Sequence, residues 1–158
     1  MSQELISHWS EYRDAAQRVL LLATRSIRIF DPDLARLELE NRENALSLRR
    51  FLTAAPGNTL RIVLRNAGPF RNRSPRLFQL LADFPHAVTV WECAPQLQQL
   101  TDALFLADDR HALARIHEDH ARSRLIIDDV KACQPYLTRF AEILEEGGTP
   151  ISATTLGL

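Results

Sequence analysis

The sequence predicts an α/β fold in which a mixed β-sheet is flanked by helices. Up to about residue 91, amphipathic segments with helical spacing alternate with short apolar segments, an order that favours parallel strands joined by helices. From 103 to 127, three strand-like segments follow one another with only tight turns between them, which favours antiparallel pairing. A chain of 158 residues is long enough to bury one sizeable core. We therefore predict a single domain over 1–148 and an apolar tail over 149–158 that docks on it.

Helices are predicted where apolar residues recur every three or four positions. The first such segment carries Leu5, Trp9 and Tyr12 on one face. The last segment ends at the adjacent glycines Gly147 and Gly148, which favour the termination of a helix. The predicted helices cover 3–24, 42–54, 75–83 and 130–146.

Strands are predicted at short segments of apolar and β-branched residues that turn signals bound. Residues 26–30 alternate polar and apolar side chains, whereas 60–64 is mostly apolar, as a central strand is. The predicted strands cover 26–30, 60–64, 87–91, 103–107, 111–116 and 124–127. The resulting order of elements is α-β-α-β-α-β-β-β-β-α.

The clearest predicted loop, over 66–75, lies in an arginine-rich segment. Residues 65–76 contain no acidic side chain, and Arg65, Arg71 and Arg73 are the candidates there for anion binding. Guanidinium groups bind phosphate and carboxylate through paired hydrogen bonds, and ligands of α/β sheets usually bind near the strand ends. The segment therefore indicates a phosphate- or nucleic-acid-binding surface, and solvated arginines without a ligand are the alternative.

Composition and charge exclude several classes of protein. The net charge of −1 and the pI of about 6.5 argue against a generic nucleic-acid binder. The sequence contains no apolar segment long enough to cross a membrane and no secretion signal, and the two cysteines make no disulfide framework. We expect a cytoplasmic protein that needs no cofactor. Residues 1–76 carry a net charge of +5 and residues 77–158 a net charge of −6, which indicates an anion-binding first half, complementary faces on two copies, or chance.

His117 and His120 are candidates for a metal site. They lie three residues apart with Glu118 and Asp119 between them, a set of side chains that can hold a metal if the turn is rigid. The same residues are also typical of a solvated turn between two strands. The spacing leaves both interpretations open, and we assign no metal to the sequence.

The region 101–145 resembles one half of the phospholipase D superfamily, in particular its single-domain bacterial nucleases. That family carries His-x-Lys-x4-Asp on a strand, followed by further strands and a C-terminal helix. The matching positions here are Thr101, Ala103 and Asp108, so only the aspartate is kept. The only lysine of the chain, Lys131, has no histidine two residues before it. The Gly-Ser-x-Asn segment of the family is also absent.

The resemblance implies a phospholipase D-like half-domain without the chemistry of that family. Threonine cannot replace an imidazole nucleophile, and alanine supplies no charge for a phosphate. We therefore do not expect phospholipase D-type catalysis. Single-motif members of the superfamily pair through their motif strands, and the apolar composition of 103–107 suggests a face buried in this way. The implied function is a non-catalytic interaction or regulatory module, homodimeric or bound to a protein partner. A phosphate- or nucleic-acid-binding protein, or a nuclease, is the alternative. The region is also similar to uncharacterised bacterial domains that are linked to acetyltransferases.

Overall fold

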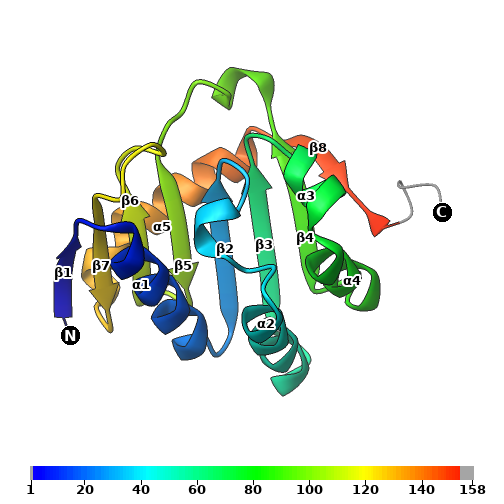
Figure 1. The fold of residues 1–158 in the computed structure, drawn as a ribbon, viewed down its shortest axis with the longest axis horizontal. Coiled ribbons are helices and arrows are strands. Elements are labelled where there is room, and N and C mark those ends of the chain that lie inside the picture. Colours follow the sequence, from blue (N-terminus) through cyan, green and yellow to red (C-terminus); the bar gives the residue numbers. More distant parts are fainter. Residues whose placement is uncertain (1, 154–158) are drawn as a thin grey trace.

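The computed structural model describes residues 2–153, which form one eight-stranded sheet with helices on both faces (Figure 1). The strand order is β1-β7-β6-β5-β2-β3-β4-β8. The strands are β1 (Ser2–Ile6), β2 (Ser26–Asp31), β3 (Thr59–Leu64), β4 (Val88–Cys93), β5 (Ala103–Ala107), β6 (His111–Arg115), β7 (Ser123–Ile127) and β8 (Gly148–Ile151). The helices are α1 (Trp9–Leu22), α2 (Arg42–Ala54), α3 (Gly68–Arg73), α4 (Pro75–Asp83) and α5 (Val130–Glu145), with short 3-10 turns at Ala35–Leu37 and Pro95–Leu97.

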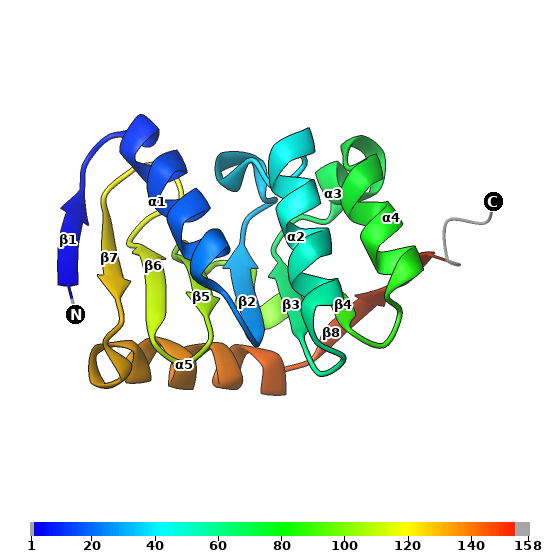
Figure 2. The same cartoon turned by 90° about the horizontal axis from the view of Figure 1, so that it is seen from below.

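The fold has three layers. Helices α1, α2 and α4 cover one face of the sheet, which we call the α1 face, and α5 crosses the other, the α5 face (Figure 2). Strands β2, β3 and β4 are mutually parallel, and every other pairing is antiparallel. The predicted mixed sheet flanked by helices is therefore confirmed. No helix of the described part is long and apolar enough to cross a membrane.

Two hydrophobic clusters fill the spaces between the layers. Side chains alternate across each strand, so Ile27 and Ile29 of β2 pack toward α1, whereas Phe30 packs toward α5. The alternation of polar and apolar residues expected for this strand corresponds to these two faces, because the apolar Ile27 and Ile29 lie on the α1 face and the polar Arg28 between them lies on the other. The larger cluster lies on the α1 face and the smaller one under α5.

Strand β5, which carries the motif positions, is buried within the chain itself. Phe105 packs on the α1 face, and Leu104 and Leu106 pack on the α5 face, each at most 3% exposed. The apolar composition of 103–107 is therefore explained by burial between two helical layers. The expectation that this strand offers a face for a second subunit loses its basis.

The first predicted helix starts later than expected. Residues 2–6 form the edge strand β1, which pairs antiparallel with β7, and α1 begins at Trp9. The Glu11 carboxylate accepts hydrogen bonds from the backbone N–H groups of Ser7 and His8, and these bonds fix the start of the helix. Leu5 fits the helical spacing, but its side chain is 76% exposed, whereas that of Ile6 is buried.

Two further segments differ from the sequence prediction. Residues 68–73, expected within a loop, form helix α3, whose buried Phe70 packs against Phe78. Part of the predicted tail forms β8, which pairs antiparallel with β4 and places Ile151 in the core. The rest of the tail beyond residue 153 lies outside the described residues.

Candidate ligand-binding site

A polar pocket opens where β2 and β3 end and β5 begins. Its cavity volume is about 640 Å³, within the range of small-molecule sites. The carboxyl ends of parallel strands are the usual ligand sites of α/β sheets. We call it the arginine pocket, and its lining residues are Pro32, Asp33, Ala35, Arg36, Arg65, Asn66, Gln98, Arg115, Glu118 and Asp119.

A buried ion pair lies at the base of the arginine pocket. Arg115, the last residue of β6, donates from Nη2 to Oδ1 of Asp31 at 3.1 Å, and both side chains are 1% exposed. Asp31 ends β2, and its other carboxylate oxygen accepts from the backbone N–H groups of Asp33 and Leu34. Burial raises the pKa of Asp31, and the guanidinium of Arg115 opposes that shift.

The guanidinium of Arg115 has unused hydrogen-bonding capacity. Its Nε and Nη1 atoms are buried and find no hydrogen-bond partner among the described residues. Arg36 stands over the ring of Trp9 at 4.0 Å from the centroid, and Arg115 lies 5.3 Å from the same centroid. Because buried donors without partners cost free energy, the two arginines around Trp9 form a ready site for a hydrogen-bond acceptor.

Arg65 is positioned by groups from the loops around it. It donates from Nη1 to the backbone oxygen of Asp102 at 2.7 Å and from Nη2 to the carboxylate of Glu118 at 2.8 Å. Its guanidinium also stands over the ring of Phe30. Glu118 in turn donates its backbone N–H to the backbone oxygen of Thr101. The carboxylate of Glu118 therefore already occupies the anion-binding side of Arg65.

The motif positions lie at opposite ends of β5. Thr101 and Ala103 lie at the end beside the arginine pocket, and Ala103 is paired with Arg115 across the β5–β6 ladder. Paired residues of adjacent strands project to the same face, so the guanidinium of Arg115 occupies the space beside the missing lysine. The sequence leads us to expect no cation at this place, because position 103 is alanine. The structure corrects this expectation, since the neighbouring strand supplies the charge.

Asp108 anchors the other end of β5. Its carboxylate accepts from the backbone N–H groups of Thr24, Arg25 and Ser26 and from the hydroxyl of Thr24. Burial opposes ionisation, but these hydrogen bonds together lower the pKa of Asp108. The one motif residue that the chain keeps therefore has a structural contact, which joins the α1–β2 connection to the sheet.

The three arginines expected to bind an anion do not form one group. Only Arg65 lines the arginine pocket. Arg71 and Arg73 are exposed on α3, and Arg73 lines a separate cavity beside Pro69 and Leu77. The short helix α3 separates positions that a loop would have allowed to converge.

His117 and His120 lie side by side in the turn after β6. Their ring centroids are 5.5 Å apart, and both line a cavity on the side of Ser7 and Arg122. The Nδ1 atom of His117 accepts from the backbone N–H of Asp119. In the described part of the chain, no group of three or more His, Cys, Asp or Glu side chains is arranged to hold a metal ion.

The sequence interpretation missed Arg36 and Arg115. A signal for Arg115 is present, because the residue follows Leu113 by two positions on a strand and so shares its buried face. An arginine on the inward face of an apolar strand needs a buried partner. Arg36 lies in a 3-10 turn, and no local pattern places it against Trp9.

Solved structures show what the fold is similar to. TrmBL2, an archaeal chromatin protein with a novel mode of DNA binding, matches with a TM-score of 0.68 and 12% identity over 94% of this chain and 54% of TrmBL2. The chain thus spans about half the length of that protein. Nuc from Salmonella typhimurium, a phospholipase D family member, matches with a TM-score of 0.61 and 12% identity over 96% of this chain and 99% of Nuc. NucT from Helicobacter pylori matches with a TM-score of 0.56 and 14% identity over 94% and 98% of the two chains. These matches show a phospholipase D-like fold.

Relatives by sequence are fewer. No curated protein matches the chain. One family model matches residues 8–152, nearly the whole chain, and its description is a domain of unknown function. Because the match covers nearly all of the chain, the chain belongs to this family, DUF7931.

Proposed function

We propose that this domain binds a phosphate-bearing ligand in the arginine pocket and does not transform it. The observation that carries the proposal is the buried guanidinium of Arg115, whose Nε and Nη1 atoms have no partner among the described residues. Arg36, which lies over the same ring of Trp9, makes no hydrogen bond or ion pair in the described part. Phosphate oxygens match the paired donors of a guanidinium, and hydrogen bonds to charged groups are the strong ones.

The absence of a nucleophile at the motif supports a binding role. Thr101 and Ala103 stand where a phospholipase D-like enzyme would carry its histidine and lysine, and guanidinium groups such as those of Arg36 and Arg115 can bind a phosphate without attacking it. The nearest histidines, His117 and His120, line a different cavity. The pocket contains carboxylates as well, so hydroxyl or amino groups on the ligand would find acceptors beside its phosphate.

Trp9 offers a direct reporter of this pocket. The chain has two tryptophans, so a Trp91→Phe variant leaves only the ring that Arg36 and Arg115 contact. Inorganic phosphate and adenosine monophosphate should each change its fluorescence saturably. We expect Arg36→Gln to weaken the affinity roughly 10-fold, as the loss of one charged hydrogen bond does.

Arg50→Gln is the matched control, because Arg50 is an exposed arginine on α2 whose side chain makes no hydrogen bond or ion pair in the described part. Its affinity should equal that of the parent. The absence of saturable binding, or equal affinities in Arg36→Gln and the parent, would overturn the proposed ligand site. Turnover of a generic phosphodiester that is lost in His117→Ala or His120→Ala would overturn the non-catalytic role.

A nucleic acid is the alternative ligand, favoured by the exposed arginines of α3. The side chains of Arg71 and Arg73 are both exposed, and neither side chain makes a hydrogen bond or ion pair among the described residues. The similar TrmBL2 is a chromatin protein with a mode of DNA binding. Fluorescence anisotropy of labelled single-stranded and duplex DNA, measured across a salt series, tests this alternative. Binding that weakens with salt and is lost in Arg71→Gln/Arg73→Gln, but not in Arg36→Gln, would favour DNA over the small ligand.

We also propose that the domain acts as an interaction module, with a second copy of the chain as the first partner to test. The edge strand β1 leaves one side of its backbone open, and Leu5 on this strand is 76% exposed. Open edge strands are templates for pairing with another chain. Light scattering at micromolar concentration should report a dimer that Leu5→Lys dissociates. A parent protein that is monomeric under those conditions would exclude the homodimer.

A further inference from the structure

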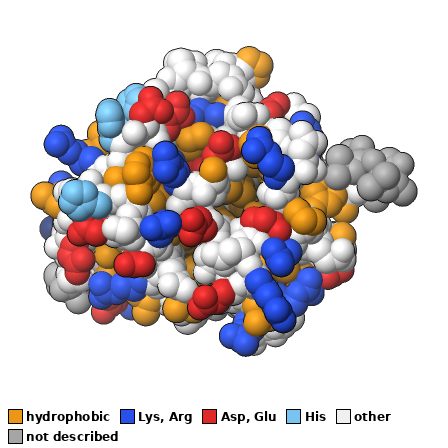
Figure 3. Space-filling view, in the orientation of Figure 1, with side chains coloured by type: hydrophobic (Ala, Val, Ile, Leu, Met, Phe, Trp, Pro, Cys, Tyr) orange, Lys and Arg blue, Asp and Glu red, His pale blue; other side chains and the backbone are white. Residues whose placement is uncertain are grey.

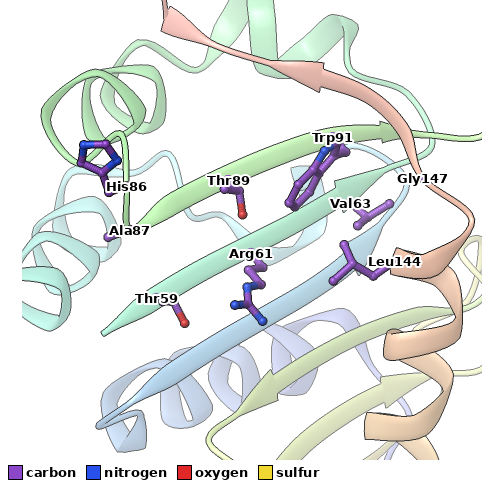
Figure 4. Close-up of a pocket in the computed structure, with 9 residues that line it drawn as sticks. All are labelled: Thr59, Arg61, Val63, His86, Ala87, Thr89, Trp91, Leu144 and Gly147. Carbon is purple, nitrogen blue, oxygen red and sulfur yellow. The ribbon is translucent and has the colours of Figure 1, made fainter. Parts of the chain in front are cut away.

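The α5 face carries a second groove that is independent of the arginine pocket. This groove lies over β3 and β4, beside the C-terminal end of α5 (Figure 4). The groove has a cavity volume of about 430 Å³. We call it the β3–β4 groove, and its lining residues are Thr59, Arg61, Val63, His86, Ala87, Thr89, Trp91, Leu144 and Gly147.

Polar side chains form a row across three adjacent strands at this groove. Arg28 of β2 is paired with Arg61 of β3, and Arg61 is paired with Thr89 of β4. The neighbours of each along its strand, such as Ile62 beside Arg61, belong to the core on the α1 face. All three polar residues therefore project onto the α5 face, about 4.8 Å apart between strands.

The row places two positive charges side by side. The side chain of Arg61 is exposed and makes no hydrogen bond or ion pair in the described part, whereas the side chain of Arg28 is half-buried and donates only to the backbone oxygen of Asp108. Burial and the nearby charge of Arg61 lower the pKa of Arg28, opposed by the carboxylates of Asp108 and Asp109. None of the residues that line the groove is acidic. A bound anion would relieve the repulsion between the two arginines.

Thr89 supplies a further sign of a missing partner. Its Oγ1 atom is buried and makes no hydrogen bond within the described residues. Thr89 is the neighbour of Arg61 in the row, so a ligand that accepts a hydrogen bond from Arg61 can also accept one from the hydroxyl of Thr89.

The groove continues from this polar row to an apolar end. Trp91 is half-buried and lies two residues along β4 from Thr89, with Val63 paired to it and Leu144 of α5 beside it. Two residues of a strand span roughly 7 Å. A ligand that uses both ends must carry an anionic group and a flat apolar group with a short spacer between them, as the phosphate and base of a nucleotide are arranged.

We propose that the β3–β4 groove binds a nucleotide, with its phosphate at Arg61 and Thr89, next to the positive charge of Arg28, and its base against Trp91. An aromatic ring is a stacking platform for any base, and guanidinium groups bind the phosphate. The groove lies on the opposite face of the sheet from the arginine pocket, where Trp9 and Arg36 stand, so the two sites bind independently.

The test uses Trp91 as the reporter. A Trp9→Phe variant leaves Trp91 as the one tryptophan of the chain, and isothermal titration calorimetry measures the affinity without relying on fluorescence. Adenosine monophosphate should quench Trp91 saturably. Adenosine has the base but no phosphate, and inorganic phosphate has no base, so each should bind to this groove at least about 10-fold more weakly than the nucleotide. The affinity for a single-stranded oligothymidylate is compared with the affinity for the free nucleotide. Tighter binding of the oligothymidylate would identify a nucleic acid as the ligand, and tighter binding of adenosine monophosphate would identify a free nucleotide; either result supports the site.

Two variants decide the outcome. Arg61→Gln replaces an exposed side chain, so the fold should be kept, and we expect it to weaken adenosine monophosphate binding roughly 10- to 100-fold. Arg36→Gln, in the other pocket, should leave the Trp91 signal unchanged. No saturable change in Trp91 fluorescence at millimolar nucleotide, or equal affinity at Trp91 in Arg61→Gln and its parent, would overturn the proposal. Inorganic phosphate binding as tightly as the nucleotide would overturn the assignment of the base to Trp91.

Discussion

At the scale of single residues, the ion pair of Arg115 and Asp31 is the feature on which the arginine pocket depends. Both side chains are 1% exposed, and each terminates a strand next to the pocket. Burying two charges costs free energy that their attraction only partly offsets, so such a pair is weak evidence for stability by itself. Its position beside the start of β5 is consistent with the binding role that we propose for the arginine pocket.

The two partners should therefore depend strongly on each other. We expect Arg115→Met alone to lower the free energy of unfolding by about 3–5 kcal/mol, because it leaves the carboxylate of Asp31 buried without its cation. The double variant Arg115→Met/Asp31→Asn should lose clearly less than the sum of the two single variants. Urea denaturation of the four proteins measures the coupling. Additive losses would show that the pair does not act as a unit.

His111 gives the fold a dependence on pH. Its side chain is 8% exposed, and its Nδ1 atom accepts from the backbone N–H of Asp128 at 3.0 Å. Burial lowers the pKa of His111, so the unfolded chain takes up the proton first as the pH falls. The contribution of this group to stability is present above its ordinary pKa of about 6.5 and is lost as the pH drops below it.

We expect the free energy of unfolding to fall between about pH 7.5 and pH 5.5, and we expect His111→Gln to reduce that fall. Glutamine keeps an acceptor for the N–H of Asp128 but does not titrate. The measurement is urea denaturation at several pH values within this window. An unchanged pH dependence in His111→Gln would assign the effect to other groups.

At the scale of elements, the two edge strands were the part that local patterns could not predict. Strand β1 consists of residues that also fit a helix, and its pairing with β7 joins residues that are far apart in the chain, from Ser2 with Ile127 to Ile6 with Ser123. Strand β8 depends on the backbone geometry of two glycines. Gly147 and Gly148 adopt positive φ angles of 76° and 147°, and Gly148 packs directly on the backbone oxygen of Glu92. A side chain at 148 would collide with that oxygen.

Gly148→Ala should therefore disturb the pairing of β8 with β4. We expect it to lower the free energy of unfolding by at least about 1 kcal/mol, because both the φ angle and the contact with Glu92 exclude a methyl group. Gly57→Ala is the matched control, since a Cβ there meets no atom within 4 Å. Thermal denaturation of both variants provides the comparison. Equal midpoints for the two would show that β8 contributes little to the fold.

At the scale of the whole molecule, the fold joins the basic first half to the acidic second half. The sheet order places β5, β6 and β7, which belong to the acidic half, between β1 and β2, which belong to the basic half. Side chains of opposite charge from the two halves therefore come into contact. Figure 3 shows basic and acidic side chains intermixed over the α1 face. The ion pairs that connect the two halves are Arg25–Asp109, Arg49–Asp83, Arg65–Glu118 and Arg115–Asp31. Contacts within one chain thus use part of the charge asymmetry that also suggested complementary copies.

Two of these four ion pairs, Arg25–Asp109 and Arg49–Asp83, are exposed and contribute little, and salt screens the two more buried pairs only weakly, so salt should have a small effect on stability. Raising sodium chloride from about 0.05 to about 0.5 M should change the free energy of unfolding by less than about 1 kcal/mol. Urea denaturation at the two salt concentrations measures this change. A much larger loss would mean that the pairs between the halves hold the fold together.

The sequence by itself determined the class of the fold and the loss of the catalytic motif. Helical and strand periodicities reflect burial within each element, so they predicted most helices and the inner strands such as 60–64 and 103–107. The residue types at Thr101 and Ala103 exclude the chemistry of that motif in any conformation. Arg65 could be placed near a ligand site because it follows the end of a central parallel strand.

Only the tertiary structure decided which cations share a site. Arg115 lies beside Ala103 through pairing between strands, and Arg36 meets it at Trp9, although 79 positions separate the two arginines in the chain. The row of Arg28, Arg61 and Thr89 likewise exists only through the register of three strands. Register and helix packing are set by contacts between distant segments, and a local pattern carries no information about them. For this reason the sequence could show that the motif lysine is missing, and only the fold could show that an arginine stands next to its place.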